Sequence, residues 1–387
     1  MDPERPKHRR HVDVVVIGGG IIGCAAAAIM ADRGARVVLV EGSAIGAGAS
    51  GRNLGAIQHP FDPVLAPLYR ESLDRYRALA DASHGGFGVA RSPAGLLLLT
   101  QDVAAAEHRA RRLREIAPEL NPEVLDPSQV SELEPSLSHG PAGIRLDTGF
   151  PVPPASATEA WAELAEERGA ELLIGLAGQP IITGDRAIGA ILKDGTEIRA
   201  DAVFVAAGPW TPALVDPSGG WRPIQATYGV TIQLRLGDEA PTHIVEEDAV
   251  DDINRTAAIS GERSAADAEP ASLFSIASAG GISTLGSTFL ATEPDAALIE
   301  PLLLRRAVAF LPAIAEAEIV GRRMCARPQS VDGRPFIGAV DGVESLFVCA
   351  GHGPWGISTG PASAAIAARA VLDGTPPPTE RAATRPI

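Results

Sequence analysis

A glycine-rich turn between two apolar strands constrains the fold more than any other feature of this sequence. Residues 14–17 read Val-Val-Val-Ile, a composition typical of a buried parallel strand. A Gly-x-Gly-x-x-Gly motif over 18–23 follows and opens an Ala-rich helical stretch, and a second apolar run over 37–40 ends at Glu41. Strand, glycine turn, helix, strand and acid in this order predict a unit that binds a dinucleotide.

The glycines and the acid of this unit have separate physical tasks. Gly18 allows the chain to turn sharply, Gly20 allows the backbone to approach a pyrophosphate, and Gly23 allows the helix to pack closely on the strand. The helix N-terminus then offers N–H groups and a partial positive charge to the phosphates. Glu41, eighteen residues after Gly23, is placed to accept hydrogen bonds from an adenosine ribose.

A membrane anchor or signal peptide is the competing interpretation of this region. Residues 14–30 are all apolar or glycine and follow a basic start that contains Lys7, Arg9 and Arg10. The run is short for a membrane span, and its three consecutive glycines weaken a membrane helix. A second apolar strand follows it instead of a cleavage site. We therefore expect no membrane span.

The composition restricts the class of protein and its partners. The chain has 387 residues, of which 45% are hydrophobic, so we expect a globular fold of two closely joined domains. A net charge of −15 argues against nucleic acid and anionic membranes as partners. Three cysteines without a CxxC pair, and histidines without metal-ligand spacing, exclude a disulfide scaffold and predict no metal site. A cytoplasmic location is the default expectation.

Periodic patterns predict the elements that follow the dinucleotide unit. A loop of small residues over 42–60 precedes an expected helix over 62–82. A strand over 95–100 and a helix over 103–116 come next, and a helix followed by a strand is expected over 155–174.

Two later segments return to the pattern of strand, glycine turn and helix, one from Ala200 to Leu214 and one in the last third of the chain. Between them, alternating segments over 221–300 predict a mostly antiparallel sheet, interrupted by a long connection over about 248–270. Nucleotide-type segments thus lie at the start, middle and end of the chain, with a sheet inserted between them. Such an arrangement favours a flavoprotein over an NAD dehydrogenase, because FAD is long and needs contacts from several segments.

At this point the chain resembles the D-amino-acid-oxidase superfamily of FAD-dependent amine oxidoreductases, and within it the glycine and sarcosine oxidases. The resemblance rests on GGGIIG (18–23), VVLVE (37–41), GASGRNLGA (48–56), VAAGPWT (205–211), ARPQSVDGRPFIG (326–338) and LFVCAGHGPWGISTGPASA (346–364). It implies FAD, a flavin ring between the two domains, and oxidation of a carbon that bears an amine.

The fold class that follows is α/β, with a Rossmann-type FAD-binding domain and an inserted, mostly antiparallel β-sheet substrate domain. We expect the FAD-binding domain to comprise 11–83, 141–215 and 321–375, the substrate domain to comprise 84–140 and 216–320, and the ends 1–10 and 376–387 to be flexible.

The resemblance implies that Arg327 holds the substrate carboxylate, five residues before the turn at Asp332. A planar guanidinium grips a carboxylate through two hydrogen bonds, which supports this role. A structural arginine that satisfies carbonyl groups at a strand end is the alternative. Phe274 falls where glycine oxidases carry a tyrosine of the substrate site, so its missing hydroxyl suggests an altered substrate head.

Two further positions depart from the family pattern. Sarcosine oxidases carry lysines for carboxylate binding and oxygen activation, and Ser283 and Ser358 fall near those places. Neither role carries over, so the electron acceptor, oxygen or another, stays open.

Cys325 decides how the flavin is attached. Sarcosine oxidases bind flavin covalently through a cysteine seven residues before the matching aspartate, which is the spacing of Cys325 to Asp332. Glycine oxidases have no such link, and Arg327 follows their pattern. We expect noncovalent FAD with Cys325 as a small buried side chain, and a covalent link is the alternative.

The remaining assignments complete the expected site. To the substrate side of the flavin we assign Arg327, Phe274, His59, Gln58 and Trp355. A surface or core role is the alternative for His59 and Gln58, and packing alone is the alternative for Trp355. The backbone of the turn at His352 is expected to stabilise the reduced flavin. The cofactor-binding residues are Gly18, Gly20, Ile21, Ile22, Gly23, Glu41, Gly42, Ser50, Arg52, Asn53, Leu54, Gly55, Ala207, Gly208, Trp210, Cys325, Arg327, Gly351, His352, Gly353, Gly356, Ile357 and Ser358.

The predicted activity is removal of a hydride from the Cα–H or an N-alkyl C–H of an amino acid to flavin N5, followed by hydrolysis of the imine. Glycine, an N-substituted glycine or a D-amino acid would fit as the small-molecule substrate. Two other hypotheses stay open: a subunit of an amino-acid or opine dehydrogenase that passes electrons to an acceptor other than oxygen, and an NAD-binding protein without enzymatic activity. Whether the chain forms a homo-oligomer is also open.

Overall fold

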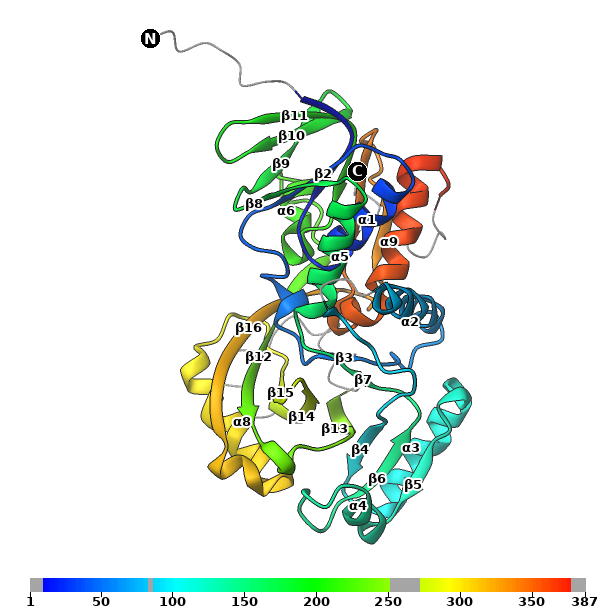
Figure 1. The fold of residues 1–387 in the computed structure, drawn as a ribbon, viewed down its shortest axis with the longest axis vertical. Helices are drawn as coiled ribbons and strands as arrows, with labels where there is room; N and C mark the ends of the chain where they lie inside the picture. The colour runs from blue at the N-terminus through cyan, green and yellow to red at the C-terminus, as the bar shows by residue number, and fades with distance from the viewer. Residues whose placement is uncertain (1–9, 83–85, 251–271, 377–387) are drawn as a thin grey trace.

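The computed structural model describes residues 10–82, 86–250 and 272–376, which form an elongated molecule with one eight-stranded sheet in each half (Figure 1) and a third sheet of two short strands. The expected flexible ends lie almost wholly outside these residues, as does the expected connection from residue 251 onward. Nowhere in the described part of the chain is a helix both long and apolar enough to cross a membrane.

The first sheet is built around β1, which pairs in parallel with β11 on one side and β2 on the other. Its main order is β17-β18-β11-β1-β2-β8, and the antiparallel strands β10 and β9 extend it from β11. The strands are β1 (Arg10–Ile17), β2 (Val37–Glu41), β8 (Glu171–Ile174), β9 (Gly178–Thr183), β10 (Arg186–Leu192), β11 (Glu197–Val205), β17 (Phe336–Ala339) and β18 (Leu346–Ala350).

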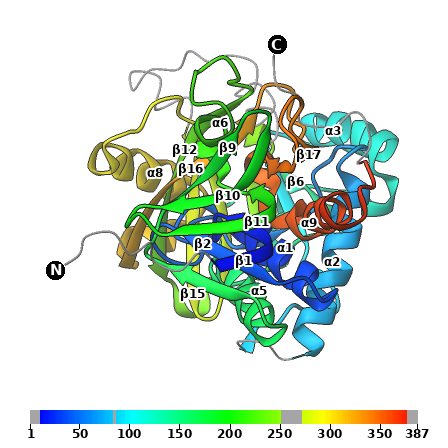
Figure 2. The same ribbon diagram turned by 90° about the horizontal axis from the view of Figure 1, so that it is seen from above.

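Three helices cover one face of the first sheet: α1 (Ile21–Asp32), α5 (Ser156–Glu167) and α9 (Gly356–Asp373). Figure 2 shows them along the same side of β1 and β2. The alanines of α1 are buried because this helix packs against both α5 and α9. A Cβ atom on Gly23 would lie 1.9 Å from the carbonyl oxygen of Gly18, so only glycine lets α1 begin this close to the end of β1.

The second sheet has the order β16-β12-β15-β14-β13-β4-β6-β5, and it is antiparallel except for the parallel pair β13 and β4. A mostly antiparallel inserted sheet was expected, and the fold class is confirmed. The strands are β4 (Leu96–Thr100), β5 (Glu123–Leu125), β6 (Ala142–Leu146), β12 (Ile224–Arg235), β13 (Ile244–Glu247), β14 (Ser272–Ala279), β15 (Ile282–Thr288) and β16 (Glu318–Ser330).

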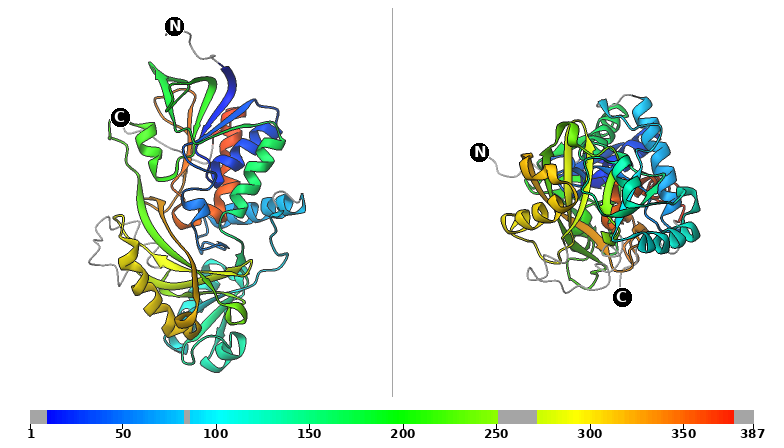
Figure 3. Two further views of the ribbon diagram at one scale, coloured as in Figure 1. Left: turned by 60° about the vertical axis from the view of Figure 1, so that its left-hand side comes forward. Right: turned by 90° about the horizontal axis from the view of Figure 1, so that it is seen from below.

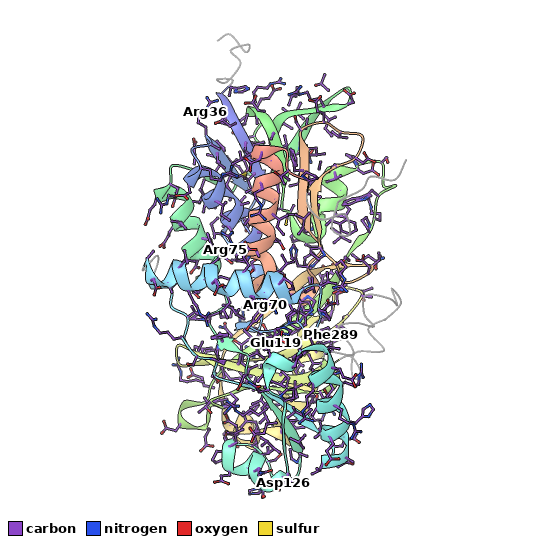
Figure 4. The ribbon with its side chains drawn as sticks, turned by 90° about the vertical axis from the view of Figure 1, so that its right-hand side faces the viewer. Arg36, Arg70, Arg75, Glu119, Asp126 and Phe289 are labelled. Carbon is purple, nitrogen blue, oxygen red and sulfur yellow. The ribbon has the colours of Figure 1, made fainter. Side chains whose placement is uncertain are left out.

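Helices cover the second sheet and connect the two halves. Helix α8 (Ala296–Phe310) packs on β14, β12 and β15, and α3 (Val103–Ile116) packs on β4, β5 and β6. Helix α2 (Ala66–Asp81) packs on α9, and Figure 4 shows its Arg70 beside Glu119 of the lower half, with Nη1 and Oε1 3.2 Å apart. The remaining elements are η1 (Ala49–Gly51), β3 (Ala56–Ile57), η3 (Pro118–Leu120), α4 (Pro127–Leu133), β7 (Phe150–Pro151), η4 (Gly208–Trp210), α6 (Thr211–Val215), η5 (Gly237–Glu239), η7 (Pro312–Glu316) and η8 (Gly353–Trp355).

The long strands β12 and β16 join the second sheet to the first half of the molecule. They pair from Ile224 opposite Ser330 to Arg235 opposite Glu318. Figure 3 shows this green and orange ribbon rising through the lower half of the molecule to the junction with the first half. Residues at the upper end of β16 therefore face the first sheet, although the strand belongs to the second.

Two expected domain boundaries differ from the sheets that the structure shows. Residues 141–215 and 321–375 were assigned whole to the FAD-binding domain, yet β6 pairs with β4 and β5, and β16 pairs with β12, all within the second sheet. The cause is that an apolar or alternating run identifies a strand but not its partner, because pairing depends on residues far away in sequence. The expected helices over 62–82 and 103–116 are present as α2, which begins at Ala66, and α3.

Candidate functional site

A cavity of about 750 Å³ lies between the two sheets and takes its walls from both. The first half contributes the turn after β1, the end of β2, the loop after β2 and the N-terminal turn of α9. The second half contributes β16 and residues at the ends of β13 and β15. Of the residues that the sequence assigned to the site, the cavity wall contains Gly18, Gly20, Ile21, Ile22, Glu41, Gly42, Ser50, Arg52, Asn53, Leu54, Gln58, Ala207, Gly208, Trp210, Cys325, Arg327, His352, Gly353, Trp355, Gly356, Ile357 and Ser358.

The first-sheet side of the cavity is shaped for a ribose and a pyrophosphate. The Glu41 carboxylate accepts hydrogen bonds from the Gly19 N–H (2.7 Å) and the Ser43 N–H (2.8 Å), which fix its orientation at the end of β2. The hydroxyl of Ser50 accepts a hydrogen bond from the Ile21 N–H (3.0 Å) at the first turn of α1. A helix N-terminus supplies N–H donors for a pyrophosphate, and a fixed carboxylate beside it supplies an acceptor for ribose hydroxyls, so together they suit an adenosine diphosphate group.

The loop after β2 is held against β16 from both sides. The amide of Asn53 donates to the Ser50 carbonyl (2.6 Å) and accepts from the Gly55 N–H (2.7 Å), so its polar groups brace the loop itself. Arg52 donates to the Met324 carbonyl (3.0 Å), and Arg323 donates in return to the Gly51 carbonyl (3.1 Å). These contacts connect the two halves of the molecule beside the cavity.

One face of β16 presents Arg323, Cys325 and Arg327, because alternate residues of a strand point to the same side. Arg327 donates from Nη1 to the Thr288 carbonyl (2.7 Å), and its guanidinium carbon lies 4.9 Å from the centre of the Phe289 ring. Phe289 is the side chain labelled at the junction in Figure 4. Gly229 on β12 makes room for this group, since a Cβ there would lie 2.4 Å from Nη2 of Arg327.

Desolvation lowers the pKa of Arg327. A guanidinium that has lost water is stabilised by an anion that enters the cavity, and its planar N–H groups suit a carboxylate. Arg327 therefore has an environment that favours an anion in the cavity, and also the carbonyl partner that a structural arginine would have.

Cys325 lies in the cavity wall with 6% of its surface exposed. Cys24 and Cys349 are fully enclosed in the core, where burial raises the pKa of both thiols and keeps them protonated. Cys325 is thus the thiol that a cofactor in this cavity would meet.

Phe274 does not reach the cavity, which corrects its assignment to the substrate site. Its ring is 1% exposed and stacks on Phe310 of α8 at 5.1 Å between centroids. Its neighbour Ser275 instead faces the cavity side, where its hydroxyl lies 3.0 Å from that of the wall residue Ser287. Phe274 and Ser275 are consecutive residues of β14, so their side chains point to opposite faces of the sheet, and Phe274 lies on the face covered by α8.

His59 also lies outside the cavity wall, behind Phe61. Its Nδ1 accepts a hydrogen bond from the Phe61 N–H (3.1 Å), and Phe61 is a wall residue with a φ of 47°. The imidazole packs edge-on against Tyr69 at 5.2 Å between centroids. Burial lowers the pKa of His59 to about 4, so the ring is neutral and serves as an acceptor. His59 supports the wall rather than touching a ligand.

Three assigned glycines lie behind the wall: Gly23 in α1, and Gly55 and Gly351 at turns with φ of 86° and 91°. Ser283 and Ser358 were expected near the lysine positions of sarcosine oxidases. The hydroxyl of Ser283 lies 2.8 Å from that of Ser278, away from the wall, whereas Ser358 lines the wall and accepts the Gln58 N–H at 3.0 Å. Among the residues that the structure describes, none form a group of three or more histidine, cysteine or acidic side chains that could hold a metal.

The structure adds wall residues that the sequence analysis missed, above all Glu246, with Phe61, Val250, Ser287 and Phe289. Glu246 is 5% exposed, and both of its carboxylate oxygens lie 3.5 Å from Nε2 of Gln58. The sequence did contain a signal for Glu246, because two adjacent acids end the strand-like segment 244–247. In a strand, consecutive side chains face opposite sides of the sheet, so one of these two acids had to face the cavity side.

The comparisons with known proteins agree with this geometry. The family described as FAD dependent oxidoreductase (DAO) matches residues 13–370. The glycine oxidase of Pseudomonas aeruginosa is 27% identical over 372 residues, which cover 92% of this chain and 93% of that enzyme. The solved glycine oxidase of Geobacillus kaustophilus has a TM-score of 0.79 at 25% identity, with 98% of this chain and 100% of that chain covered.

A third comparison extends the likeness of the fold. The solved iminodiacetate oxidase of Chelativorans sp. BNC1 has a TM-score of 0.79 at 22% identity and covers 96% of this chain and 99% of that chain. At this identity the match bears on the fold alone. All three matches span nearly the whole length of both proteins.

The buried His59 predicts how stability depends on pH. Below pH 6.5 the unfolded chain binds a proton at His59, whereas the folded protein binds it only near pH 4. Unfolding therefore becomes easier as the pH falls through this window, by roughly 3 kcal/mol in total. Between pH 7.5 and pH 5 we expect urea denaturation to show a loss of about 2 kcal/mol, because pH 5 still lies above the pKa of His59 in the folded protein, and we expect the variant His59→Gln to lose less stability over the same interval.

His108→Gln is the control for this measurement, because His108 is exposed on α3. It should keep the full pH dependence of the parent protein. An equal pH dependence in His59→Gln and His108→Gln would contradict the role given to His59.

Proposed function

Since the chain belongs to the DAO family of FAD-dependent oxidoreductases, we propose that it oxidises an amino acid or an N-substituted glycine at the carbon that carries the amine. The observation that carries this proposal is Arg327, a desolvated guanidinium in the wall of a cavity whose other half suits a dinucleotide. The full-length similarity to a glycine oxidase supports the same class of substrate. The family match excludes the alternative of an NAD-binding protein without enzymatic activity.

The residues of the cavity fit FAD. We infer that Glu41 holds the ribose, that the N-terminal turn of α1 and Ser50 hold the pyrophosphate, and that the flavin lies between β16 and the turn over 351–358. When bound, FAD supplies at N5 the acceptor for a hydride from the substrate. The N–H groups at the start of α9 are placed to favour negative charge on the pyrimidine side of the ring.

The protein itself orients the substrate and excludes water. Arg327 binds the carboxylate through two hydrogen bonds and so fixes the position of the C–H bond beside the flavin. Phe61, Phe289 and Trp355 supply apolar walls, and such a site disfavours a charged amine and favours the neutral form that oxidation requires. The imine product leaves and hydrolyses in water.

The electron acceptor divides the proposal into two versions. Ser358 stands in the cavity wall where the related sarcosine oxidases carry a lysine, so a dehydrogenase that uses an acceptor other than oxygen is the second candidate. The three cysteines are free, which is compatible with a cytoplasmic enzyme. We also retain the formation of a homo-oligomer as part of the proposal.

The proposed activity predicts that the purified protein is yellow and that an amino acid bleaches it in the absence of air. Glycine, N-methylglycine, iminodiacetate and D-alanine form a suitable panel, followed by spectrophotometry of the visible flavin absorption. Peroxide formed in air would identify an oxidase, and reduction of a dye without peroxide would identify a dehydrogenase. A protein that binds no FAD, or whose flavin no amine reduces, would contradict the proposal.

The flavin is expected to be noncovalent, with Cys325 a neighbour rather than a ligand. Acid precipitation should then leave the yellow colour in the supernatant for both the parent protein and Cys325→Ser. Colour retained in the pellet of the parent protein, and released from Cys325→Ser, would instead establish a covalent link through Cys325.

Replacement of Arg327 should weaken substrate binding without loss of the cofactor. We expect Arg327→Ala to raise the KM for the amino acid by about 100-fold, because a pair of charged hydrogen bonds is lost. Arg322→Ala is the matched control, since Arg322 is exposed on the same strand and pairs with Glu300. An unchanged KM in Arg327→Ala would leave this arginine a structural role only.

A further inference from the structure

The side-chain amide of Gln58 carries a buried acceptor in the wall of the cavity. The residue is 8% exposed and is one of the wall residues. Among the residues that the structure describes, none donates a hydrogen bond to its Oε1. A buried carbonyl oxygen without a donor costs free energy, so this position favours a ligand that brings an N–H group into the cavity.

The carboxylate of Glu246 sets the orientation of this amide. Both of its oxygens lie 3.5 Å from Nε2 of Gln58, at the long limit of a hydrogen bond. The reversed amide would bring Oε1 toward the carboxylate, and two acceptors repel each other. Because Nε2 and Oε1 lie on different sides of the amide carbon, Oε1 is turned away from Glu246.

The backbone around Gln58 is fixed by three contacts. The Gln58 N–H donates to the hydroxyl of Ser358 in the first turn of α9 (3.0 Å). Before it, Ile57 pairs with β7, and after it the His59 N–H donates to the Thr148 hydroxyl (2.9 Å). Gln58 thus stands between the turn proposed to contact the flavin and the second sheet, on a rigid stretch of chain.

We propose that Oε1 of Gln58 accepts a hydrogen bond from the N–H of the substrate amine while Arg327 binds the carboxylate. This inference rests on the proposed function and adds to it the group that recognises the amine. A neutral amine has an N–H to donate and keeps its lone pair for the reaction. An amide oxygen accepts that hydrogen bond without the negative charge that would hold the amine in its protonated form.

Gln58 is therefore a specificity-determining residue, which selects carboxylates that carry an N–H group. An ether of the same shape as the amine turns an oxygen lone pair toward Oε1 and leaves this buried acceptor unpaired. Methoxyacetate is the ether counterpart of N-methylglycine, and oxydiacetate is that of iminodiacetate. Acetate and propanoate are the counterparts of glycine and D-alanine without the amine.

The test compares the best substrate of the amino-acid panel with its counterpart that has no N–H group. Substrate affinity comes from the concentration dependence of anaerobic flavin reduction, and the affinity of the counterpart from its competition with the substrate in the same reaction. In the FAD-loaded parent protein the substrate should bind more tightly than its counterpart.

In Gln58→Met this preference should fall by about 3- to 10-fold, because methionine has a similar length but no amide oxygen. The variant also removes Nε2 from Glu246. The negative charge that this leaves would favour the amine, so its effect is opposite in sign to the expected fall. Gln225→Met is the matched control, since Gln225 is exposed on β12 and lies outside the cavity wall, and its ratio of affinities should equal that of the parent protein.

Two outcomes would overturn the inference. The first is a counterpart that binds the parent protein as tightly as the substrate does, a result that needs no variant and so survives a variant that fails to fold. The second is a ratio that Gln58→Met leaves unchanged, as expected if Gln58 only supports the wall or binds a water molecule. If no amine of the panel reduces the flavin of the parent protein, the proposed function fails instead, so the two failures are distinguishable.

Discussion

The contact between the turn after β1 and the first turn of α1 is the constraint on which the rest of the site depends. The missing side chain of Gly23 allows α1 to begin against the Gly18 carbonyl, and this close packing aims the N-terminus of the helix at the cavity. Ser50 and Glu41 are then fixed by backbone N–H groups of the same turn. This short segment thus sets the positions of the N-terminus of α1, the Ser50 hydroxyl and the Glu41 carboxylate.

The second half of the site depends on strand alternation instead of helix geometry. β12 and β16 carry one face of the second sheet up to the first half, so Cys325 and Arg327, two positions apart on β16, both lie in the cavity wall. The loop bonds made by Arg323 close the same junction. Residues that hold the halves together and residues that face a ligand therefore share one strand, which makes the shape of the cavity sensitive to the register of β16.

The sequence predicted those parts of the site that depend on neighbours in the chain. The glycine turn, Glu41 and the loop over 50–54 lie within one continuous segment of the chain. The spacing of its glycines and its acid can therefore be recognised from the sequence alone. Phe274 was misplaced, and the alternative of a core role for His59 is the one that agrees with the structure. The surroundings of both side chains are set by distant partners, Phe310 in one case and Tyr69 with Phe61 in the other. The same reason explains why β16 was recognised as a site segment but assigned to the FAD-binding domain, although it pairs within the second sheet.

The pair Glu246 and Glu247 shows how one strand serves both faces of a sheet. Glu247 and Arg306 form an ion pair on the face covered by α8, and the same carboxylate accepts the Phe274 N–H of β14. Glu246, the preceding residue, turns to the opposite face and lies in the cavity wall. A strand with one face packed and the other face turned to a cavity can therefore keep the cavity wall rigid, because the packed face anchors its backbone.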